Sequence, residues 1–274
     1  MSTTGPLTAK SANPATSATS AKSANSANSA NSANRANPML AGADLAATAR
    51  LLADGTRATF CLALLDGRAW TPTELARHAG VAPSTATEHL NAMVAGGLLA
   101  EERQGRHRYV RLADQQVAEL IETMAATAPV RPTPPLRTLS ADSRRRALAH
   151  ARTCYDHLAG RVGVAIADAM TERDLVDWDH GLSLTPQGHR WLSDLEIEVP
   201  TTAKRPALRP CLDWTERRPH LAGAVGAALC SHALDNGWIK RVGTTRAVLV
   251  TPTGREIFGA RLGLSEQVLT PAPN

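Results

Sequence analysis

Two Cys–His pairs in the second half of the chain carry the residue types that bind soft metal ions. Cys154 precedes His157 in the run Cys-Tyr-Asp-His. Cys211 begins the run Cys-Leu-Asp, and His220 follows that run further along the chain. Thiolates and imidazoles are ligands for zinc and copper(I), and two neighbouring thiols can instead sense oxidants. If the two segments pack against each other, the four side chains will meet. The pattern predicts a metal or redox site, and it leaves the effector unknown.

A purely structural role for the same residues remains open. Free cysteines pack as small hydrophobic residues, and a buried histidine can simply satisfy nearby backbone groups. The spacing of His150, Cys154 and His157 would place three potential ligands on one helical face, if that stretch is helical. With the structural role, no cofactor is required.

The Cys–His pairs lie in a segment that repeats itself. The run 157–165 is echoed by 220–228, and the Thr-Pro pair at 185 is echoed at 251. Each copy has a small-residue helix, then a strand pair, then a closing helix that a Thr-Pro start suits. The strand pairs are expected at 175–178 with 182–184, and at 237–242 with 246–250. We expect two helix–hairpin–helix repeats, at about 150–196 and 207–262, packed as a pseudo-twofold pair.

A second set of polar residues follows one face of an expected helix. Thr71 or Thr73 can cap a short helix that Gly80 ends, and Pro83 then opens the next one. The apolar residues of this second helix face inward at helical spacing: Ala86, Leu90, Met93 and Val94. Its outer face carries Ser84, Thr85, Thr87, Glu88, His89 and Asn91. Short hydroxyls, an imidazole and an amide at the start of a helix match the hydrogen-bonding groups of the DNA major groove.

A hairpin with a basic tip follows this helix. Residues 98–103 and 107–112 alternate between apolar and polar side chains, and Gln104-Gly105-Arg106 joins them. The hairpin carries Arg103, Arg106, His107 and Arg108. These side chains are placed to touch phosphates or the minor groove. Further helices are expected at 45–52, at 56–65, and from a cap at Asp114 through Met124.

This order of elements resembles the ArsR/SmtB family of bacterial transcriptional repressors. The matching runs are Leu52 to Arg57, Thr73 to Ala76, Ser84 to Leu90 and Ala95 to Leu98. The resemblance implies a homodimer whose recognition helices enter successive major grooves of a palindromic DNA operator. It also implies that Ser84, Thr85, Thr87 and His89 lie at the DNA face. Both familiar metal sites of the family are missing, because 73–80 holds no Cys and 114–124 holds no His.

Composition sets the expected domain limits within the 274 residues. The expected parts are a disordered Ser/Ala/Asn-rich tail at 1–43, a winged helix-turn-helix at 44–126, a Pro-rich linker at 127–140, a C-terminal domain of two repeats at 141–266, and a tail at 267–274. The expected fold class is therefore mainly α with small β-hairpins (α+β).

Positive charge is local rather than spread over the chain. The net charge is +5, but residues 44–126 hold eight basic side chains against ten acidic ones. Specific DNA binding would then depend on a small phosphate footprint, doubled by dimerisation. The run Arg144-Arg145-Arg146 is either a second contact to the DNA backbone or the exposed face of a helix.

The sequence predicts a dimeric, DNA-binding transcriptional repressor controlled by a signal sensed in its C-terminal domain. The alternative is an architectural or protein-interaction module that binds DNA without sequence preference. No dinucleotide, Walker, nucleophile-elbow or zincin motif is present, so we do not expect an enzyme. No apolar run reaches transmembrane length, and four widely spaced cysteines fit a reducing compartment. We expect a cytoplasmic, nucleoid-associated protein with no membrane partner.

Overall fold

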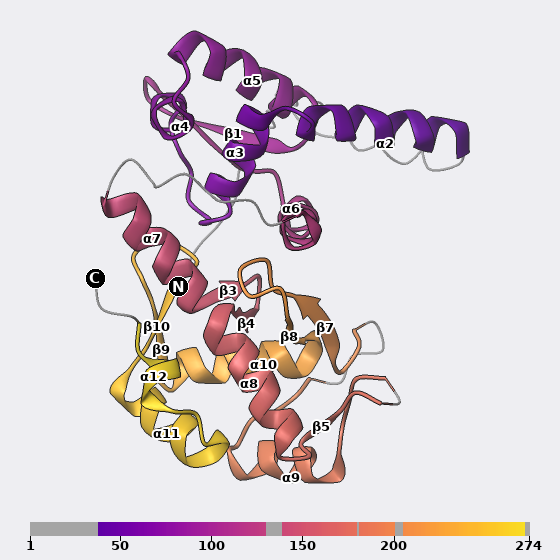
Figure 1. Ribbon diagram of the computed structural model, residues 1–274, viewed down its shortest axis with the longest axis vertical. Helices are drawn as coiled ribbons and strands as arrows, with labels where there is room; N and C mark the ends of the chain where they lie inside the picture. The colour runs from indigo at the N-terminus through magenta and orange to yellow at the C-terminus, as the bar shows by residue number, and fades with distance from the viewer. Residues whose placement is uncertain (1–37, 130–138, 180, 201–204, 272–274) are drawn as a thin grey trace, which may run out of the picture. The chain divides into compact units, whose positions relative to one another are not determined.

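The computed structural model describes residues 38–129, 139–179, 181–200 and 205–271 (Figure 1). Residues 1–37 of the tail expected at 1–43, and the linker prolines at 132, 134 and 135, lie outside these residues. The chain divides into two compact units, Met1–Ala49 and Arg50–Asn274. All side-chain contacts described below lie within the second unit.

The first described stretch has the element order of a winged helix-turn-helix. The elements are α2 (Pro38–Leu52), α3 (Gly55–Leu64), α4 (Pro72–Ala79), α5 (Pro83–Ala95), β1 (Leu99–Gln104), β2 (His107–Leu112) and α6 (Gln115–Thr127). Helix α2 begins at Pro38, inside the expected N-terminal tail. The helices and the hairpin that the sequence predicts in this stretch are confirmed.

Local capping explains where the helices of this stretch begin and end. Thr71 rather than Thr73 caps α4 through a capping box, in which the Glu74 backbone N–H donates to the Thr71 hydroxyl at 3.3 Å and the Thr71 N–H donates to the Glu74 carboxylate at 2.8 Å. Gly80 ends α4 in the left-handed conformation at φ 71°. Asp114 caps α6 by accepting from the Val117 N–H at 2.9 Å.

The wing is the antiparallel pair β1–β2, which runs in register from Leu99 opposite Leu112 to Gln104 opposite His107. Two residues make the turn, and the first of them, Gly105, has a φ of 56°. A positive φ at this position suits glycine in a tight hairpin. The hairpin therefore holds Arg106 at its tip.

One hydrophobic cluster forms the centre of this winged helix. Its fully buried members include Phe60 from α3, Leu75 from α4, Leu90 and Met93 from α5, and Val110 from β2. Each helix contributes one apolar face, as the 3.6-residue period requires. The core thus fixes which face of α5 points away from the molecule.

The stretch beyond residue 138 combines short hairpins with helices. The elements are α7 (Leu139–His150), β3 (Arg152–Cys154), β4 (His157–Ala159), α8 (Gly160–Glu172), β5 (Val176–Asp177), β6 (Ser183–Leu184), α9 (Pro186–Asp194), β7 (Arg209–Leu212), β8 (Pro219–Ala222), α10 (Gly223–Asp235), β9 (Ile239–Arg241), β10 (Val248–Val250), α11 (Pro252–Leu262) and α12 (Glu266–Leu269). Each of its sheets described here is a two-stranded antiparallel pair.

Two of these hairpins differ from the sequence-based expectation. Residues 157–159 and 220–222 are strands, and the small-residue helices begin only at Gly160 and Gly223. Both glycines have a positive φ, and a Cβ on Gly160 would lie 2.8 Å from the Ala149 carbonyl oxygen. His150 ends α7, whereas Cys154 lies in strand β3 and His157 in strand β4. The three residues therefore do not share a helical face, and that prediction is wrong.

The two hairpin–helix segments pack crosswise. Helix α8 packs on β8, helix α10 packs on β4, and β4 lies beside β8. Two helical glycines let each helix lie close to its own hairpin: a Cβ on Gly163 would lie 2.5 Å from the Leu158 carbonyl oxygen, and a Cβ on Gly226 would lie 2.3 Å from the Leu221 carbonyl oxygen. A Cβ on Gly226 would also lie 3.3 Å from the Cβ of His157 in the other segment. Crosswise packing therefore brings β4 and β8, with their histidines, to one place.

A second hydrophobic cluster holds this C-terminal stretch together. It includes Val162 and Met170 of α8, Val225 of α10 and Phe258 of α11. Leu269 of α12 is only 1% exposed and belongs to the same cluster, so the chain remains packed where a tail from residue 267 was expected. Among the described residues, no helix combines the length and apolar character needed to cross a bilayer.

Candidate functional site

Helix α5 separates a buried face from a polar one. Ala86, Leu90 and Met93 are 0% exposed, whereas Val94 is half-buried. Most of the predicted DNA-contacting residues of α5 are exposed: Ser84, Thr87, Glu88 and Asn91. Thr85 is half-buried. The outer face therefore offers hydroxyl, amide and carboxylate groups, which are the groups that read base edges in the major groove.

His89, another predicted residue of this face, has two protein partners at the start of α3. Its Nδ1 lies 3.3 Å from a guanidinium nitrogen of Arg57, and its Nε2 lies 3.9 Å from a carboxylate oxygen of Asp54. Asp54 also caps α3 by accepting from the Arg57 N–H at 2.9 Å. The His89 ring thus ties α5 to the start of α3.

The wing is tied to α5 through Arg108. Its guanidinium donates to the Asn91 side-chain oxygen at 2.8 Å and pairs with the Glu101 carboxylate at 2.8 Å. Arg103 also pairs with Glu101, at 3.1 Å. Arg106 and His107 are exposed at the tip, and within the described residues Arg106 has no ion-pair partner. Arg108 therefore orients the wing, while Arg106 presents a positive charge.

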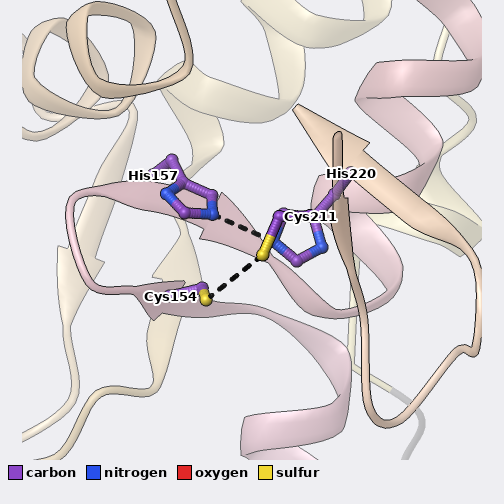
Figure 2. Close-up of side chains that lie close together, drawn as sticks. All are labelled: Cys154, His157, Cys211 and His220. Carbon is purple, nitrogen blue, oxygen red and sulfur yellow. Dashed lines mark hydrogen bonds between the residues drawn. The ribbon is translucent and has the colours of Figure 1, made fainter. Parts of the chain in front are cut away.

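The second site is the cluster of Cys154, His157, Cys211 and His220, called the Cys–His cluster from here on (Figure 2). One ligand atom from each residue lies within 4.8 Å of all the others. The two sulfur atoms are 3.9 Å apart, and the Nε2 atoms of the two histidines are 3.1 Å apart. The four side chains that the sequence pattern grouped are therefore neighbours in space.

Strand register explains how each hairpin presents its pair. Cys154 stands opposite His157 in β3–β4, and Cys211 stands opposite His220 in β7–β8. Facing residues of an antiparallel pair project on the same side of the sheet. Each hairpin thus supplies one sulfur and one imidazole to the centre.

Each imidazole has a carboxylate on its far side. The Nδ1 of His157 lies 3.2 Å from Asp156, and the Nδ1 of His220 lies 3.3 Å from Asp213, although the second contact lacks hydrogen-bond alignment. Both Nε2 atoms consequently face the centre of the cluster. A carboxylate behind an imidazole fixes its orientation and raises its basicity as a ligand.

Asp213 is a buried anchor that the sequence reading missed. The residue is 0% exposed, pairs with the equally buried Arg152 at 2.9 Å, and accepts from the Gly160 N–H at 2.7 Å. Burial favours the neutral acid, but His220 and Arg152 outweigh it, so the pKa of Asp213 lies far below its ordinary value. This carboxylate joins the second hairpin to the start of α8.

The two thiols have different electrostatic surroundings. The neighbouring Cys211 and burial raise the pKa of Cys154, whereas the hydrogen bond with Cys154 lowers the pKa of Cys211. Cys154 is 2% exposed and Cys211 is half-buried. Since the thiolate is the form that binds metals and reacts, Cys211 is the first of the two to ionise.

Cys154 also contacts the winged helix. Its sulfur donates to the Glu122 carboxylate of α6 at 3.1 Å, and Glu122 is only 4% exposed. Burial would raise the pKa of Glu122, but the charges of Arg246 and Arg152 outweigh it and lower the pKa. Glu122 had one signal in the sequence: it lies four residues from each of the small residues Ala118 and Ala126, on a face of α6 that packs inward.

Arg246 completes this connection from the loop between β9 and β10. Its guanidinium pairs with Glu122 at 2.6 Å and donates to the Leu65 carbonyl oxygen at 2.7 Å. Its backbone N–H donates to the Asp66 carbonyl oxygen at 2.9 Å, and its carbonyl oxygen accepts from the Thr153 N–H at 2.8 Å. A continuous set of bonds thus leads from the Cys–His cluster to α6 and to the end of α3.

The Arg144–Arg146 run lies on the exposed side of α7. Arg145 bonds to Asp142 at 3.2 Å, and the Arg146 Nε bonds to the same carboxylate at 2.8 Å. Exposed pairs three and four residues apart are a common feature of solvated helices. These contacts agree with the interpretation as an exposed helix face.

Known proteins match the winged helix and, in one case, most of the chain. Residues 52–102 match the family described as a helix-turn-helix domain. The uncharacterized HTH-type transcriptional regulator YdfF of Bacillus subtilis is 38% identical over 224 residues, which cover 81% of this chain and 98% of that protein. The HTH-type transcriptional regulator CmtR of Mycobacterium bovis is 37% identical over 86 residues, 30% of this chain and 72% of that protein.

Solved structures with a likeness to this chain cover about a third of it. The cadmium metal-sensor CmtR from Mycobacterium tuberculosis has 30% identity and a TM-score of 0.28 over 34% of this chain and 98% of its own. The homodimeric winged helix-turn-helix domain Mb0332 from Mycobacterium bovis, described as a possible ArsR-family regulator, has 24% identity and a TM-score of 0.28 over 39% of this chain and 86% of its own.

The fold of residues 50–127, with an exposed polar helix face beside a basic wing, defines a winged helix-turn-helix DNA-binding protein. Since the match to YdfF extends over almost the whole of that relative, the assignment does not depend on the winged helix alone. The chain belongs to the HTH-type transcriptional regulators, and its winged helix is of the ArsR type.

Proposed function

We propose that this regulator is a repressor that binds a palindromic operator as a homodimer. Helix α5 reads bases through Ser84, Thr85, Thr87, Glu88 and Asn91, and His89 holds the helix in position. The observation that carries this proposal is the division of α5 into a fully buried face and an exposed polar face. A helix divided in this way can enter a major groove without disturbing its own core.

The wing supplies the phosphate contacts in this proposal. Arg106 and His107 lie at the exposed tip, while Arg103 and Arg108, which face each other next to the Gln104–His107 pair, are paired with Glu101. Non-specific attraction to DNA scales with the number of phosphates that basic side chains neutralise. Two wings in a dimer double that number without a globally basic domain.

Exposed apolar residues on α6 support a homodimer. Leu120 is 41% exposed and Met124 is 45% exposed, and the two are four residues apart on one face of the helix. Large apolar side chains in such a row favour a second apolar surface over water. We therefore place part of the dimer interface on α6.

We also propose that the two parts of the chain have different functions. Residues 44–126 bind DNA, and residues 141–266 sense a signal through two related units at about 150–196 and 207–262. The crosswise packing of β3–β4–α8 with β7–β8–α10 supports a repeat origin for the two units. Their separate hydrophobic cluster supports a domain distinct from the winged helix.

Binding of the purified full chain to its own promoter fragment tests the DNA-binding function. Fluorescence anisotropy with and without excess unlabelled random DNA separates specific from non-specific affinity. We expect nanomolar binding that survives the competitor, since specific sites are commonly bound at least about 1,000-fold more tightly. Equal affinity for both DNAs would instead favour an architectural module.

A further inference from the structure

We infer that Cys154, His157, Cys211 and His220 form a tetrahedral binding site for one thiophilic d¹⁰ metal ion, with Zn²⁺ as its reference ligand. The inference rests on the proposed function only where it concerns the effect on DNA. The site lies outside the winged helix, on two hairpins of the C-terminal stretch.

The sulfur–sulfur and nitrogen–nitrogen distances in the cluster are close to those of a tetrahedron around zinc. Zinc bonds of about 2.3 Å to sulfur and about 2.05 Å to nitrogen place two sulfurs about 3.8 Å apart and two nitrogens about 3.3 Å apart. The observed separations are 3.9 Å between the sulfurs and 3.1 Å between the Nε2 atoms. An ion can therefore enter with small side-chain shifts.

The surroundings of the cluster suit a closed metal site. Cys154, His157 and His220 are buried, and Cys211 is half-buried. Each imidazole turns its Nε2 inward and its Nδ1 toward a carboxylate, which is the arrangement that metal-bound histidines usually have. A purely structural role for the histidines would not require both Nε2 atoms to face the same point as two sulfurs.

Charge and proton balance follow directly from the ligand set. The ion binds both cysteines as thiolates, so each thiol that is protonated in the metal-free protein releases its proton to solvent. Two thiolates then neutralise the two positive charges of Zn²⁺, which makes a buried site electrostatically acceptable. No oxidant or reductant takes part.

Disulfide formation is the competing chemistry, and the histidines argue against it. The sulfurs would have to move from 3.9 Å to about 2.05 Å, and neither imidazole would gain a partner from that bond. The metal site, in contrast, uses all four groups. Reversible oxidation without metal binding is therefore an outcome that would overturn the inference.

Glu122 gives the ion a route to the winged helix. The Cys154 thiol donates a hydrogen bond to this buried carboxylate of α6, and a metal-bound thiolate has no proton with which to form it. The Glu122 carboxylate then keeps its ion pair with Arg246. Arg246 also donates hydrogen bonds to the carbonyl oxygens of Leu65 and Asp66. Metal binding thus removes the Cys154 contact from those that join α6 to the C-terminal stretch, which also include the Arg246–Glu122 pair and the bond from Arg217 to the Ala125 carbonyl oxygen at 3.1 Å.

Metal binding is measured first, without DNA, on the reduced full-length chain titrated with Co²⁺ and then Zn²⁺. We expect one Co²⁺ per chain, with the strong visible bands of tetrahedral cobalt and thiolate charge transfer in the near ultraviolet, all displaced by Zn²⁺. Cys154→Ala and Cys211→Ala should each weaken Zn²⁺ binding at least about 100-fold. Cys230→Ala is the matched control, because Cys230 and Cys154 are both 2% exposed.

A second measurement uses the wild-type chain alone, so its result does not depend on whether the variants fold. X-ray absorption of the zinc-loaded wild-type chain should give two sulfur and two nitrogen neighbours. Octahedral cobalt spectra, a different ligand set, or a Cys154–Cys211 disulfide in a chain that takes up no metal would overturn the inference.

The effect on DNA is measured separately by anisotropy with and without Zn²⁺. We expect operator affinity to change by about 5- to 150-fold, the usual range for coupling between two sites. Glu122→Gln should keep Zn²⁺ affinity and lose most of that change. Zinc bound with unchanged operator affinity would overturn the link to α6, and absence of any operator preference would overturn the proposed function while the metal site stood.

Discussion

The Nε2 atoms of His157 and His220 are 3.1 Å apart, although the two residues are separated by 63 positions in the chain. Each histidine belongs to a hairpin that leads into a glycine-containing helix, and each helix packs on the strand of the other segment. Gly163 and Gly226 let each helix lie close to its own hairpin, and the absence of a Cβ at Gly226 also leaves room for His157 of the other segment. The meeting of the two rings is thus a consequence of the fold of the whole stretch.

Asp156 is expected to act as a positioning residue for His157 in the metal site. Asp156→Asn should weaken Zn²⁺ binding by about 10- to 100-fold, since loss of such a partner leaves the ring free to turn. Titration with Co²⁺ measures this affinity, and a shift of the visible bands would reveal a changed imidazole.

Asp168→Asn is the control for that experiment. Asp168 is a carboxylate of α8 that pairs with Arg218 at 2.6 Å and is not a member of the Cys–His cluster. Equal losses in the two variants would show that Asp156 acts only through general stability.

Thr87 is the residue of α5 best suited to a test of base reading. It is exposed, and among the described residues its hydroxyl bonds only to the Pro83 carbonyl oxygen within its own helix, at 2.8 Å. Thr87→Ala should cost on the order of 1–3 kcal/mol at the operator and little on random DNA. Competition anisotropy on both DNAs measures the difference.

Thr59→Ala provides the comparison, because Thr59 makes the same 2.8 Å bond to Gly55 on α3. If Thr87→Ala weakens binding to both DNAs alike, the hydroxyl does not read bases. A His89 side chain that contacted only DNA would give His89→Ala a similar cost. Because the His89 ring contacts Arg57 and Asp54, its removal also disturbs the packing of α5 against the start of α3. The effect of His89→Ala on DNA affinity is therefore harder to interpret.

The winged helix was predictable because its signals are local. Thr71, Pro72 and Glu74 define the start of α4, Gly80 defines its end, and Gly105 defines the wing turn. Each of these residues acts within a few positions of itself. The choice between Thr71 and Thr73 was the part that needed the structure.

The C-terminal stretch was predictable only where the chain repeats itself. The echo between 157–165 and 220–228 correctly suggested that the two Cys–His pairs could meet. It did not reveal the strands at 152–154 and 157–159, because three-residue strands leave almost no periodic pattern. Glu122, Asp213 and Arg246 escaped notice since their partners lie far away in the sequence.

The wing tip makes a prediction about salt. Arg106 is exposed and has no ion-pair partner in the part of the chain described here, so its charge is available to a phosphate. Arg106→Ala should weaken binding to all DNA sequences. It should also lower the slope of log affinity against log salt concentration by about one for each phosphate contact that is lost. Affinities measured over a series of salt concentrations give that slope.

Arg190→Ala, on the exposed surface of α9, is the control for a general loss of charge. An unchanged slope in Arg106→Ala would remove the wing tip from the phosphate footprint. A lowered slope in both variants would point to net charge instead of a specific contact.

The exposed face of α6 makes a prediction about assembly. Met124→Glu places a charge in the apolar row that Leu120 begins, and a buried unpaired carboxylate opposes association. We expect the wild-type chain to sediment as a dimer, and Met124→Glu to approach the monomer mass of 29.0 kDa. Operator affinity should fall with it, because one half-site contact is lost.

Leu249→Glu on β10 is the matched control, since Leu249 and Met124 are both 45% exposed. A dimer that persists in Met124→Glu at micromolar concentration would place the interface elsewhere. Dissociation in the β10 variant alone would assign it to the C-terminal stretch. If Met124→Glu dissociates while Leu249→Glu does not, the apolar row on α6 is part of the surface that sets the spacing of the two recognition helices.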